Sequence, residues 1–471
     1  MGCADSLRTM SALPPVQVVG AGLAGSECAF QLASRGIPVE LWEMRPQRST
    51  PAHLTGGFAE LVCSNSLRSD DPEHPAGGLK REMEVFDSLV IRAARAAAVP
   101  AGSALAVDRD RFSSSITREL ERHPLIRVRR EELCELPDGD GVLATGPLTS
   151  QAMSERLQAL LGDQHLAFYD AIAPIVEAES LDETVLFRAS RYGKGGGDDY
   201  LNAPFDRERY LEFWREVVAA DVIEPRDFER RLFFEGCLPI EELARRGVDT
   251  LRFGPMKPVG LETPDGRRPW AVVQLRQENL ARTHYNLVGF QSRMRWPEQR
   301  RVLRMVPGLE RAVFVRYGQV HRNTFVCAPL HLDRLYRLKQ RPALRLAGQL
   351  TGVEGYLESA ATGLLVAVYL AIERQTGTSP EPLPDTTTLG ALARHLTESP
   401  PERYQPANIN YGLLTELEEK LPRKARRAAL AARARRELEV WIERHPAALA
   451  APTAAPSPTA ALAPQHLPWI D

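Results

Sequence analysis

Short runs of apolar, mostly β-branched residues alternate with helically spaced segments in the first third of the chain. The run Val16–Val19 leads directly into a helical pattern, and the run Val39–Glu43 follows it. Helical spacing also covers Phe112–His123, ahead of apolar runs at 126–128 and 141–146. Strands separated by helices are typical of a parallel sheet with helices on both faces. This part of the chain is therefore predicted to form a doubly wound, Rossmann-like α/β domain.

The middle of the chain, residues 180–316, loses this alternation. Glycine and proline punctuate it, and its apolar runs at 270–273 and 286–290 are not separated by regular helical patterns. The strand-to-helix rhythm returns at Leu344–Gly348, followed by a long helical pattern from about Tyr356 to Arg374 that is expected to stop at Gly377. We therefore predict that a separate α+β domain is inserted into the first domain.

These patterns divide the chain into five predicted parts. They are a flexible lead (1–14), the first part of the α/β domain (15–179), the insertion (180–316), the second part of the α/β domain with a basic helix (317–445), and a disordered tail rich in alanine and proline (446–471).

The turn after the first predicted strand carries a G-x-G-x-x-G motif. Its residues are Gly20, Ala21, Gly22, Leu23, Ala24 and Gly25. In such a motif the first glycine allows a tight turn, the second lets a pyrophosphate approach the backbone, and the third lets the helix pack closely. Glu43 follows 18 residues after Gly25, where a carboxylate that binds ribose is expected. Strand, glycines, helix and acid together predict a dinucleotide site.

A second glycine-rich turn near the end of the domain contains Gly348, Gly352 and Gly355. A late strand-to-helix unit of this kind closes the first domain around the insertion. Flavoproteins are commonly built in this way, whereas simple NAD-binding folds usually are not. The predicted cofactor is therefore FAD.

Composition excludes several classes of protein. The net charge is −2, with 44% hydrophobic and 25% charged residues, so nucleic-acid contact would have to come from local patches. The sequence contains no apolar run near the roughly 18 residues of a membrane span and no apolar signal core. Its six cysteines show no C-x-x-C pairing or zinc spacing, which predicts a cytoplasmic protein with reduced thiols and no metal.

Two cysteines lie in unusual local sequences. Cys63 follows an apolar run and precedes Ser-Asn-Ser, which places its thiol at a loop or helix start where backbone amides favour the thiolate. Cys237 lies between Gly236 and Pro239 in an irregular segment, and Glu235 is close enough to move a proton. The alternative for either cysteine is a structural role. The glycine-rich segment 191–202 is either a loop that closes over a ligand or a surface turn.

Two segments are strongly basic. Arg293–Arg304 contains five arginines and Trp296, and Lys420–Arg436 contains eight lysines and arginines without an acid. Arginine binds phosphate in a bidentate manner, and an exposed aromatic ring can stack on an unpaired base. The segments are therefore either RNA contacts or solvated charged faces.

Several longer motifs resemble the folate- and FAD-dependent tRNA (uracil-5-)-methyltransferases, the TrmFO family. They occur in family order over about residues 15–440. They are Gly20–Gly25, Trp42–Pro46, Cys63–Ser66, Ala144–Pro147, Arg191–Gly196, Glu235–Pro239, Phe253–Val259, His321–Thr324 and Gly352–Ala360.

The resemblance implies the site and the reaction. FAD would lie on Gly20, Gly22, Gly25 and Glu43, with the 348–355 turn facing the flavin. Cys63 and Cys237 match the catalytic thiols of the family. A one-carbon unit would pass from 5,10-methylenetetrahydrofolate through the flavin to C5 of the T-loop uridine at tRNA position 54, with NADH or NADPH as reductant. No membrane and no obligate protein partner are implied.

The resemblance leaves some assignments open. Cys237 is expected to attack C6 of uracil, and Cys63 to act as the thiol beside the flavin and as a base, with the reverse assignment as the alternative. Ribosomal RNA, rather than tRNA, is an alternative substrate. An FAD oxidoreductase acting on a small metabolite is an alternative in which both basic segments are solvated faces.

Overall fold

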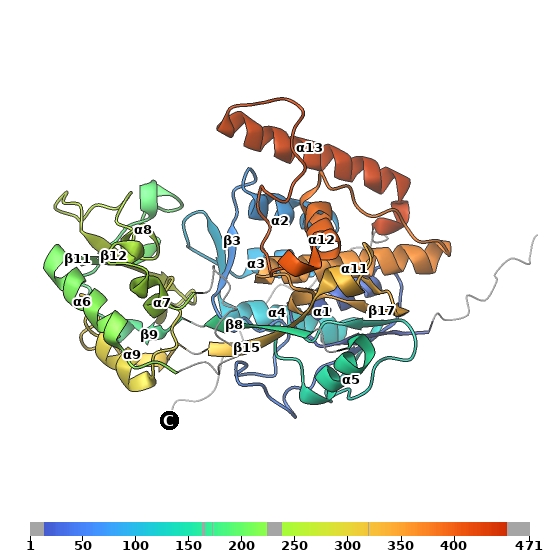
Figure 1. Ribbon diagram of the computed structural model, residues 1–471, viewed down its shortest axis with the longest axis horizontal. Helices are drawn as coiled ribbons and strands as arrows, with labels where there is room; N and C mark the ends of the chain where they lie inside the picture. The colour runs from blue at the N-terminus through green and yellow to red at the C-terminus, as the bar shows by residue number, and fades with distance from the viewer. Residues whose placement is uncertain (1–13, 163–164, 172, 224–237, 319, 450–471) are drawn as a thin grey trace, which may run out of the picture.

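The computed structural model describes residues 14–162, 165–171, 173–223, 238–318 and 320–449 (Figure 1). Its larger part contains a mostly parallel sheet with strand order β16-β17-β7-β1-β2-β6. In this order the strands β6, β2, β1, β7 and β17 follow the 3-2-1-4-5 arrangement of a Rossmann fold. The bounds are β1 (Val16–Val19), β2 (Val39–Trp42), β6 (Ile126–Arg129), β7 (Gly141–Leu143), β16 (Arg337–Leu338) and β17 (Arg341–Leu346).

The helices α1 (Leu23–Ser34) and α11 (Tyr356–Thr376) pack against each other through their backbones. A Cβ atom on Gly363 would lie 2.1 Å from the carbonyl oxygen of Ala24, so only glycine permits this approach. The helix α11 ends at Gly377 in the left-handed conformation, as the sequence predicts. By length and composition α11 could cross a membrane, but 89% of its most apolar window is buried, as in the core helix of a folded domain.

Further elements complete the first part of the chain. A small antiparallel sheet has the order β3-β5-β4. Their bounds, with those of the remaining helices, are β3 (Ser66–Ser69), β4 (Ala98–Val99), β5 (Ala104–Val107), α2 (Pro75–Val85), α3 (Leu89–Ala96), α4 (Arg109–Arg122), α5 (Gln151–Leu161), α10 (Ala328–His331), α12 (Thr388–Glu398) and α13 (Arg423–Arg444).

The second part is an antiparallel sheet with the order β10-β11-β12-β13-β9-β14 and its own hydrophobic core. The strands are β9 (Ile175–Glu177), β10 (Phe187–Arg188), β11 (Tyr200–Phe205), β12 (Ala271–Gln277), β13 (His284–Leu287) and β14 (Phe314–Arg316). Four described helices accompany them: α6 (Arg207–Ala219), α7 (Ile240–Arg245), α8 (Thr250–Phe253) and α9 (Trp296–Leu303).

The chain passes between the two parts along a two-stranded ribbon. Strand β8 (His165–Ala171) pairs with the antiparallel strand β15 (Val320–Val326), and Figure 1 shows this ribbon between the two parts. The predicted class, a Rossmann-like α/β domain with an inserted α+β domain, is confirmed. The exact limits of the insertion stay a proposal, although its sheet already begins at Ile175, a few residues before the predicted start.

Candidate active site

A cavity that is partly open to solvent lies at the carboxyl ends of β1 and β7. The two strands are neighbours in the sheet. The chain continues from β1 to β2 on one side of this pair and from β7 toward β17 on the other side. This is the topological switch point at which doubly wound sheets bind their ligands. Val19, Gly20 and Ala144 line the cavity at this point.

The three glycines of the first motif differ in what surrounds them. Gly20 has φ +96°, and a Cβ atom there would lie 2.6 Å from the carbonyl oxygen of Ala144. A Cβ atom on Gly25 would lie 1.8 Å from the carbonyl oxygen of Gly20. A Cβ atom on Gly22 would meet no described atom within 4 Å, although Gly22 lines the cavity. Gly20 and Gly25 are thus required by the fold, whereas Gly22 keeps space free for a ligand.

Glu43 lies at the end of β2 beside the first glycine turn. One carboxylate oxygen accepts a hydrogen bond of 3.0 Å from the amide of Ala21. The backbone amide, Nε and Nη2 of Arg45 donate the other bonds, at 3.0, 2.9 and 3.0 Å. Burial alone would raise the pKa of Glu43, but the bonds from Arg45 and Ala21 bring it below its ordinary value. The carboxylate is held ionised at the cavity wall, and ribose hydroxyls would share it with Arg45.

Unpaired polar atoms in the cavity wall test whether FAD fits. Nε1 of Trp42 and Oε1 of Glu132 are buried and have no hydrogen-bond partner among the described residues. Both side chains line the cavity. Buried polar atoms are normally paired, so this donor and this acceptor fit a polar ligand such as the adenosine half of FAD. Together with the open space at Gly22, they make the cavity suitable for the cofactor.

The second glycine-rich turn contributes less to the cavity than its composition suggests. Gly348 lines the cavity, but Gly352 and Gly355 are not among its lining residues. A Cβ atom on Gly352 would lie 2.3 Å from Oη of Tyr404, and one on Gly355 would lie 2.5 Å from Oε2 of Glu358. Both have positive φ, so these glycines shape the turn before α11. Their predicted contact with the cofactor stays a prediction.

Cys63 lies in an irregular segment before β3, so the loop alternative holds for this cysteine. Its amide donates a hydrogen bond of 2.5 Å to Oη of Tyr356, the first residue of α11, which lines the cavity. Its carbonyl oxygen accepts a bond of 3.1 Å from Nη2 of Arg109, the first residue of α4. The backbone of Cys63 is therefore fixed from both sides at the edge of the cavity.

Two arginines lie near this segment. The guanidinium groups of Arg109 and Arg316 both interact electrostatically with Cys63. Burial lowers the pKa of Arg109, but the carboxylate of Glu278 at 2.5 Å more than offsets this and the net shift is upward. Burial and the charge of Arg109 lower the pKa of Arg316. Neighbouring guanidinium groups stabilise a thiolate, as a reactive cysteine requires.

Asn65, two residues after Cys63, connects this segment to the insertion. Its side chain is fully buried and donates bonds of 3.0 Å to the carbonyl oxygens of Val107 and Gln277. Its oxygen accepts a bond of 2.7 Å from Nε of Arg276. Arg276 and Gln277 belong to β12, so the Cys63 segment is positioned by both parts of the chain.

The sequence alone does not single out Arg109, Asn65 or Tyr356. Asn65 and Tyr356 do fall inside motifs of the TrmFO resemblance, and these motifs were the sequence signal that pointed to them.

Cys237 and Glu235 lie outside the described residues, so their predicted roles stay predictions. No disulfide joins the four described cysteines, Cys28, Cys63, Cys134 and Cys327. Cys28 and Cys327 are buried, and burial raises the pKa of both thiols.

The glycine-rich segment 191–202 packs between the two parts of the chain. Asp199 is buried, and its carboxylate accepts a bond of 2.6 Å from the amide of Gly102 in the β4–β5 turn. Oη of Tyr200 donates a bond of 2.9 Å to the carbonyl oxygen of Ala101. This segment therefore holds the insertion against the small sheet.

One predicted RNA contact needs correction. Arg293 is only 7% exposed and pairs with the carboxylates of Glu241 and Glu242, so it belongs to the core of the insertion. Further along the segment, Arg295 pairs with Asp221, and Arg301 pairs with Glu216 and Glu298. The charge of segment 293–304 is thus largely neutralised by neighbouring acids.

The basic helix is confirmed as α13, although it extends to Arg444. One face, formed by Leu430, Ala434, Leu438 and Trp441, is buried against the first part of the chain. Arg436 and Arg426 are exposed on this helix. A basic, solvent-facing surface is therefore present along α13.

Fold and site together define a flavoprotein of the Rossmann type that carries a cysteine beside its cofactor cavity. The family of glucose inhibited division protein A matches residues 15–377. The methylenetetrahydrofolate--tRNA-(uracil-5-)-methyltransferase TrmFO of Geobacter sulfurreducens is 56% identical over 429 residues, which cover 91% of this chain and 98% of that protein. The protein of the same name from Natranaerobius thermophilus is 52% identical over 91% of this chain and 99% of its own length. The chain therefore belongs to the TrmFO family.

A solved structure supports the fold. The structure of Aquifex aeolicus GidA in its form I crystal superposes with a TM-score of 0.66, at 16% identity, over 92% of this chain and 77% of that protein. At this identity the similarity bears on the fold alone.

Proposed function

We propose that this protein transfers a one-carbon unit from 5,10-methylenetetrahydrofolate to C5 of a uridine in tRNA, giving 5-methyluridine. The observation that carries the proposal is the position of Cys63, held by Tyr356 at the edge of the cofactor cavity and flanked by guanidinium groups. The names of relatives that are 52–56% identical support the same reaction. A tRNA substrate and reduced thiols suit the cytoplasm.

The two thiols have distinct proposed roles. The Cys237 thiolate adds to C6 of uracil and so makes C5 nucleophilic, because an unactivated uracil C5 is a poor nucleophile. Cys63 removes the C5 proton after the one-carbon unit is attached, and the Cys237 thiolate then leaves. Glu235 moves a proton near Cys237. When bound, FAD supplies the relay for the one-carbon unit and the hydride that completes the methyl group, and NADH or NADPH restores its electrons.

The tRNA is proposed to bind through its T-arm, with the target uridine turned out of the folded loop at a cost of a few kcal/mol. The exposed basic side of α13 would contact phosphates. On the insertion, the ring of Trp296 is 54% exposed and stacks on Tyr317 at 5.7 Å, which in turn stacks on Phe314 at 5.2 Å. Because Tyr317 follows Arg316, this stack begins next to the Cys63 site and offers a surface for an unpaired base.

The decisive experiment incubates purified protein with labelled methylenetetrahydrofolate, NADPH or NADH, and either unmodified tRNA or ribosomal RNA. We expect label on one T-loop uridine of the tRNA. Label on ribosomal RNA alone would show that the substrate is ribosomal RNA and not tRNA. Absence of label together with no tRNA shift in gels at low salt would favour an oxidoreductase of small metabolites.

A tRNA containing 5-fluorouridine separates the two thiols. With fluorine at C5 there is no C5 proton for a base to remove. The reaction therefore stops with the attacking thiol still bound to C6. We expect a covalent complex with the Cys63→Ala variant and none with the Cys237→Ala variant. The opposite pattern would exchange the two roles.

A further inference from the structure

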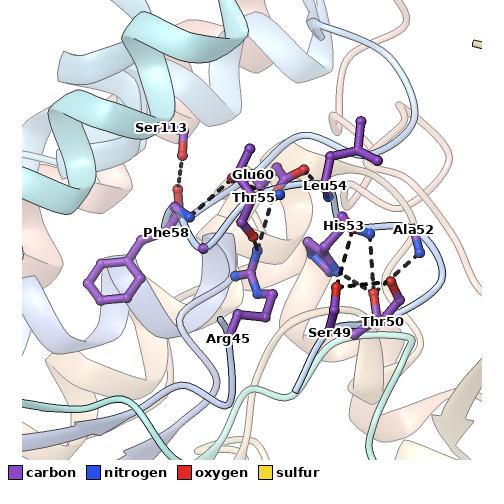
Figure 2. Close-up of polar contacts among 12 residues, drawn as sticks. Arg45, Ser49, Thr50, Ala52, His53, Leu54, Thr55, Phe58, Glu60 and Ser113 are labelled. Carbon is purple, nitrogen blue, oxygen red and sulfur yellow. Dashed lines mark hydrogen bonds and ion pairs between the residues drawn. The ribbon is translucent and has the colours of Figure 1, made fainter. Parts of the chain in front are cut away.

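The segment between β2 and β3 forms one wall of the cofactor cavity and contains a histidine that the proposed reaction does not use. His53, Thr50 and Glu60 all line the cavity. Figure 2 shows how Arg45, Thr55 and Glu60 fasten this segment, with the His53 ring held against Thr50. The carbonyl oxygen of Ala52 accepts a bond of 3.5 Å from Arg316, so the segment also contacts the insertion.

The hydrogen bonds of Thr50 determine which nitrogen of His53 carries the proton. Oγ1 of Thr50 accepts bonds of 3.3 Å from the amides of Ala52 and His53. Both lone pairs of the hydroxyl oxygen are thereby used, so its hydrogen is donated to Nδ1 of His53, 2.6 Å away. Since Nδ1 accepts, the neutral ring carries its proton on Nε2.

The surroundings keep this ring neutral. Burial lowers the pKa of His53 to about 4, and the positive charges of Arg45 and Arg316 act in the same direction. The carboxylates of Glu60 and Glu43 oppose them without reversing the result. The ring therefore presents an N–H donor without adding charge near the cofactor.

Nε2 has no hydrogen-bond partner among the described residues and is not one of their buried unpaired atoms, and His53 lines the cavity. We propose that His53 donates its Nε2 hydrogen to an acceptor atom of bound FAD, and that Thr50 is the residue that fixes the ring in the donating form. The inference rests on the FAD-binding part of the proposed function, and it does not depend on the RNA substrate.

The test measures binding of FAD to apoprotein by quenching of flavin fluorescence, with the visible flavin spectrum as a second readout. His53→Ala is expected to weaken FAD binding by about tenfold, the range of one hydrogen bond. His53→Gln, whose side-chain amide donates from a similar position, is expected to stay within about threefold of the wild type. Thr50→Val keeps the shape of Thr50 without its hydroxyl and is expected to give an intermediate loss. Leu54→Ala, at a neighbouring side chain that is 77% exposed, is the matched control.

The outcomes separate this inference from the proposed function. Wild-type affinity in His53→Ala, or equal losses in His53→Ala and His53→Gln, would overturn the contact. If His53→Ala does not fold, wild-type affinity in Thr50→Val together with loss in His53→Gln would overturn it as well. A wild-type protein that binds FAD and transfers no one-carbon unit to RNA would contradict the proposed function and leave the His53 contact in place.

Discussion

The amide of Cys63 and the hydroxyl of Tyr356 are joined by a hydrogen bond of 2.5 Å across 293 residues of sequence. This contact connects the cysteine segment to the first turn of α11, whose side chains line the cofactor cavity. The backbone of the cysteine segment is thus held beside the cavity by a helix that belongs to the core of the first domain.

Tyr356→Phe is expected to lower methyl transfer by about tenfold and to destabilise the fold by about 1 kcal/mol, because the Cys63 amide loses its acceptor. Turnover and thermal unfolding measure the two effects. Tyr369→Phe, further along α11, is the control, since Oη of Tyr369 accepts a similar bond of 3.0 Å from the amide of Leu383, which follows the helix. Equal turnover of both variants would show that the Cys63 contact has no bearing on catalysis.

Gly22→Ala and Gly25→Ala are expected to fail in different ways. An added methyl group at Gly25 collides with the backbone of Gly20, so that variant should lose more than about 3 kcal/mol of stability. At Gly22 the methyl group has space and φ is −70°, so the variant should fold normally and bind FAD about 100-fold more weakly. Denaturant unfolding and FAD titration distinguish them, and normal FAD affinity of Gly22→Ala would argue against a pyrophosphate at this position.

Trp296→Ala is expected to weaken tRNA binding by roughly tenfold, within the 1–3 kcal/mol of base stacking, and Trp296→Phe by less. Because stacking is not a charge interaction, the loss should be similar at low and high salt. Arg436→Ala on α13 should instead reduce the salt dependence itself. Gel shifts at several salt concentrations test both variants. An unchanged affinity of Trp296→Ala for tRNA would show that the aromatic stack does not contact the RNA.

Glu82 predicts a specific dependence of stability on pH. Burial raises its pKa from 4.5 to about 7, although the amides of Thr388 and Leu389 donate bonds of 2.7 and 2.8 Å to it. The folded protein therefore binds more protons than the unfolded chain between these pH values, and this group's contribution to stability falls as pH rises from 4.5 to 7. The shift corresponds to about 3 kcal/mol.

Denaturant unfolding of the wild type and of Glu82→Gln at several pH values isolates this group. The free-energy difference between the two proteins should change across pH 4.5–7 and stay constant above pH 8. A constant difference over the whole range would mean that Glu82 ionises normally.

The elements with strong local signals were predictable from the sequence. The strand Val16–Val19, the glycine turn at 20–25 and the end of α11 at Gly377 all depend on residues close in sequence, and all occur in the structure. The α13 helix was predicted because alanines separate its cations. Such features are decided by backbone propensity and periodicity.

Features that depend on distant partners were not predictable in this way. Arg293 was interpreted as a surface cation, but Glu241 and Glu242 on another helix remove it from solvent. Asn65 owes its role to β12, more than 200 residues away. Tyr404, which lies beside Gly352, is likewise far along the chain, and the predicted contact of Gly352 with the cofactor stays a prediction. Only tertiary structure distinguishes these cases.

The ribbon of β8 and β15 carries both crossings of the chain between the two domains along one pair of adjacent strands. A module whose entrance and exit are neighbours can be exchanged during evolution without breaking the scaffold that hosts it. Because Arg276 and Gln277 of the insertion bond to Asn65, any exchanged module would also have to hold the Cys63 segment in place.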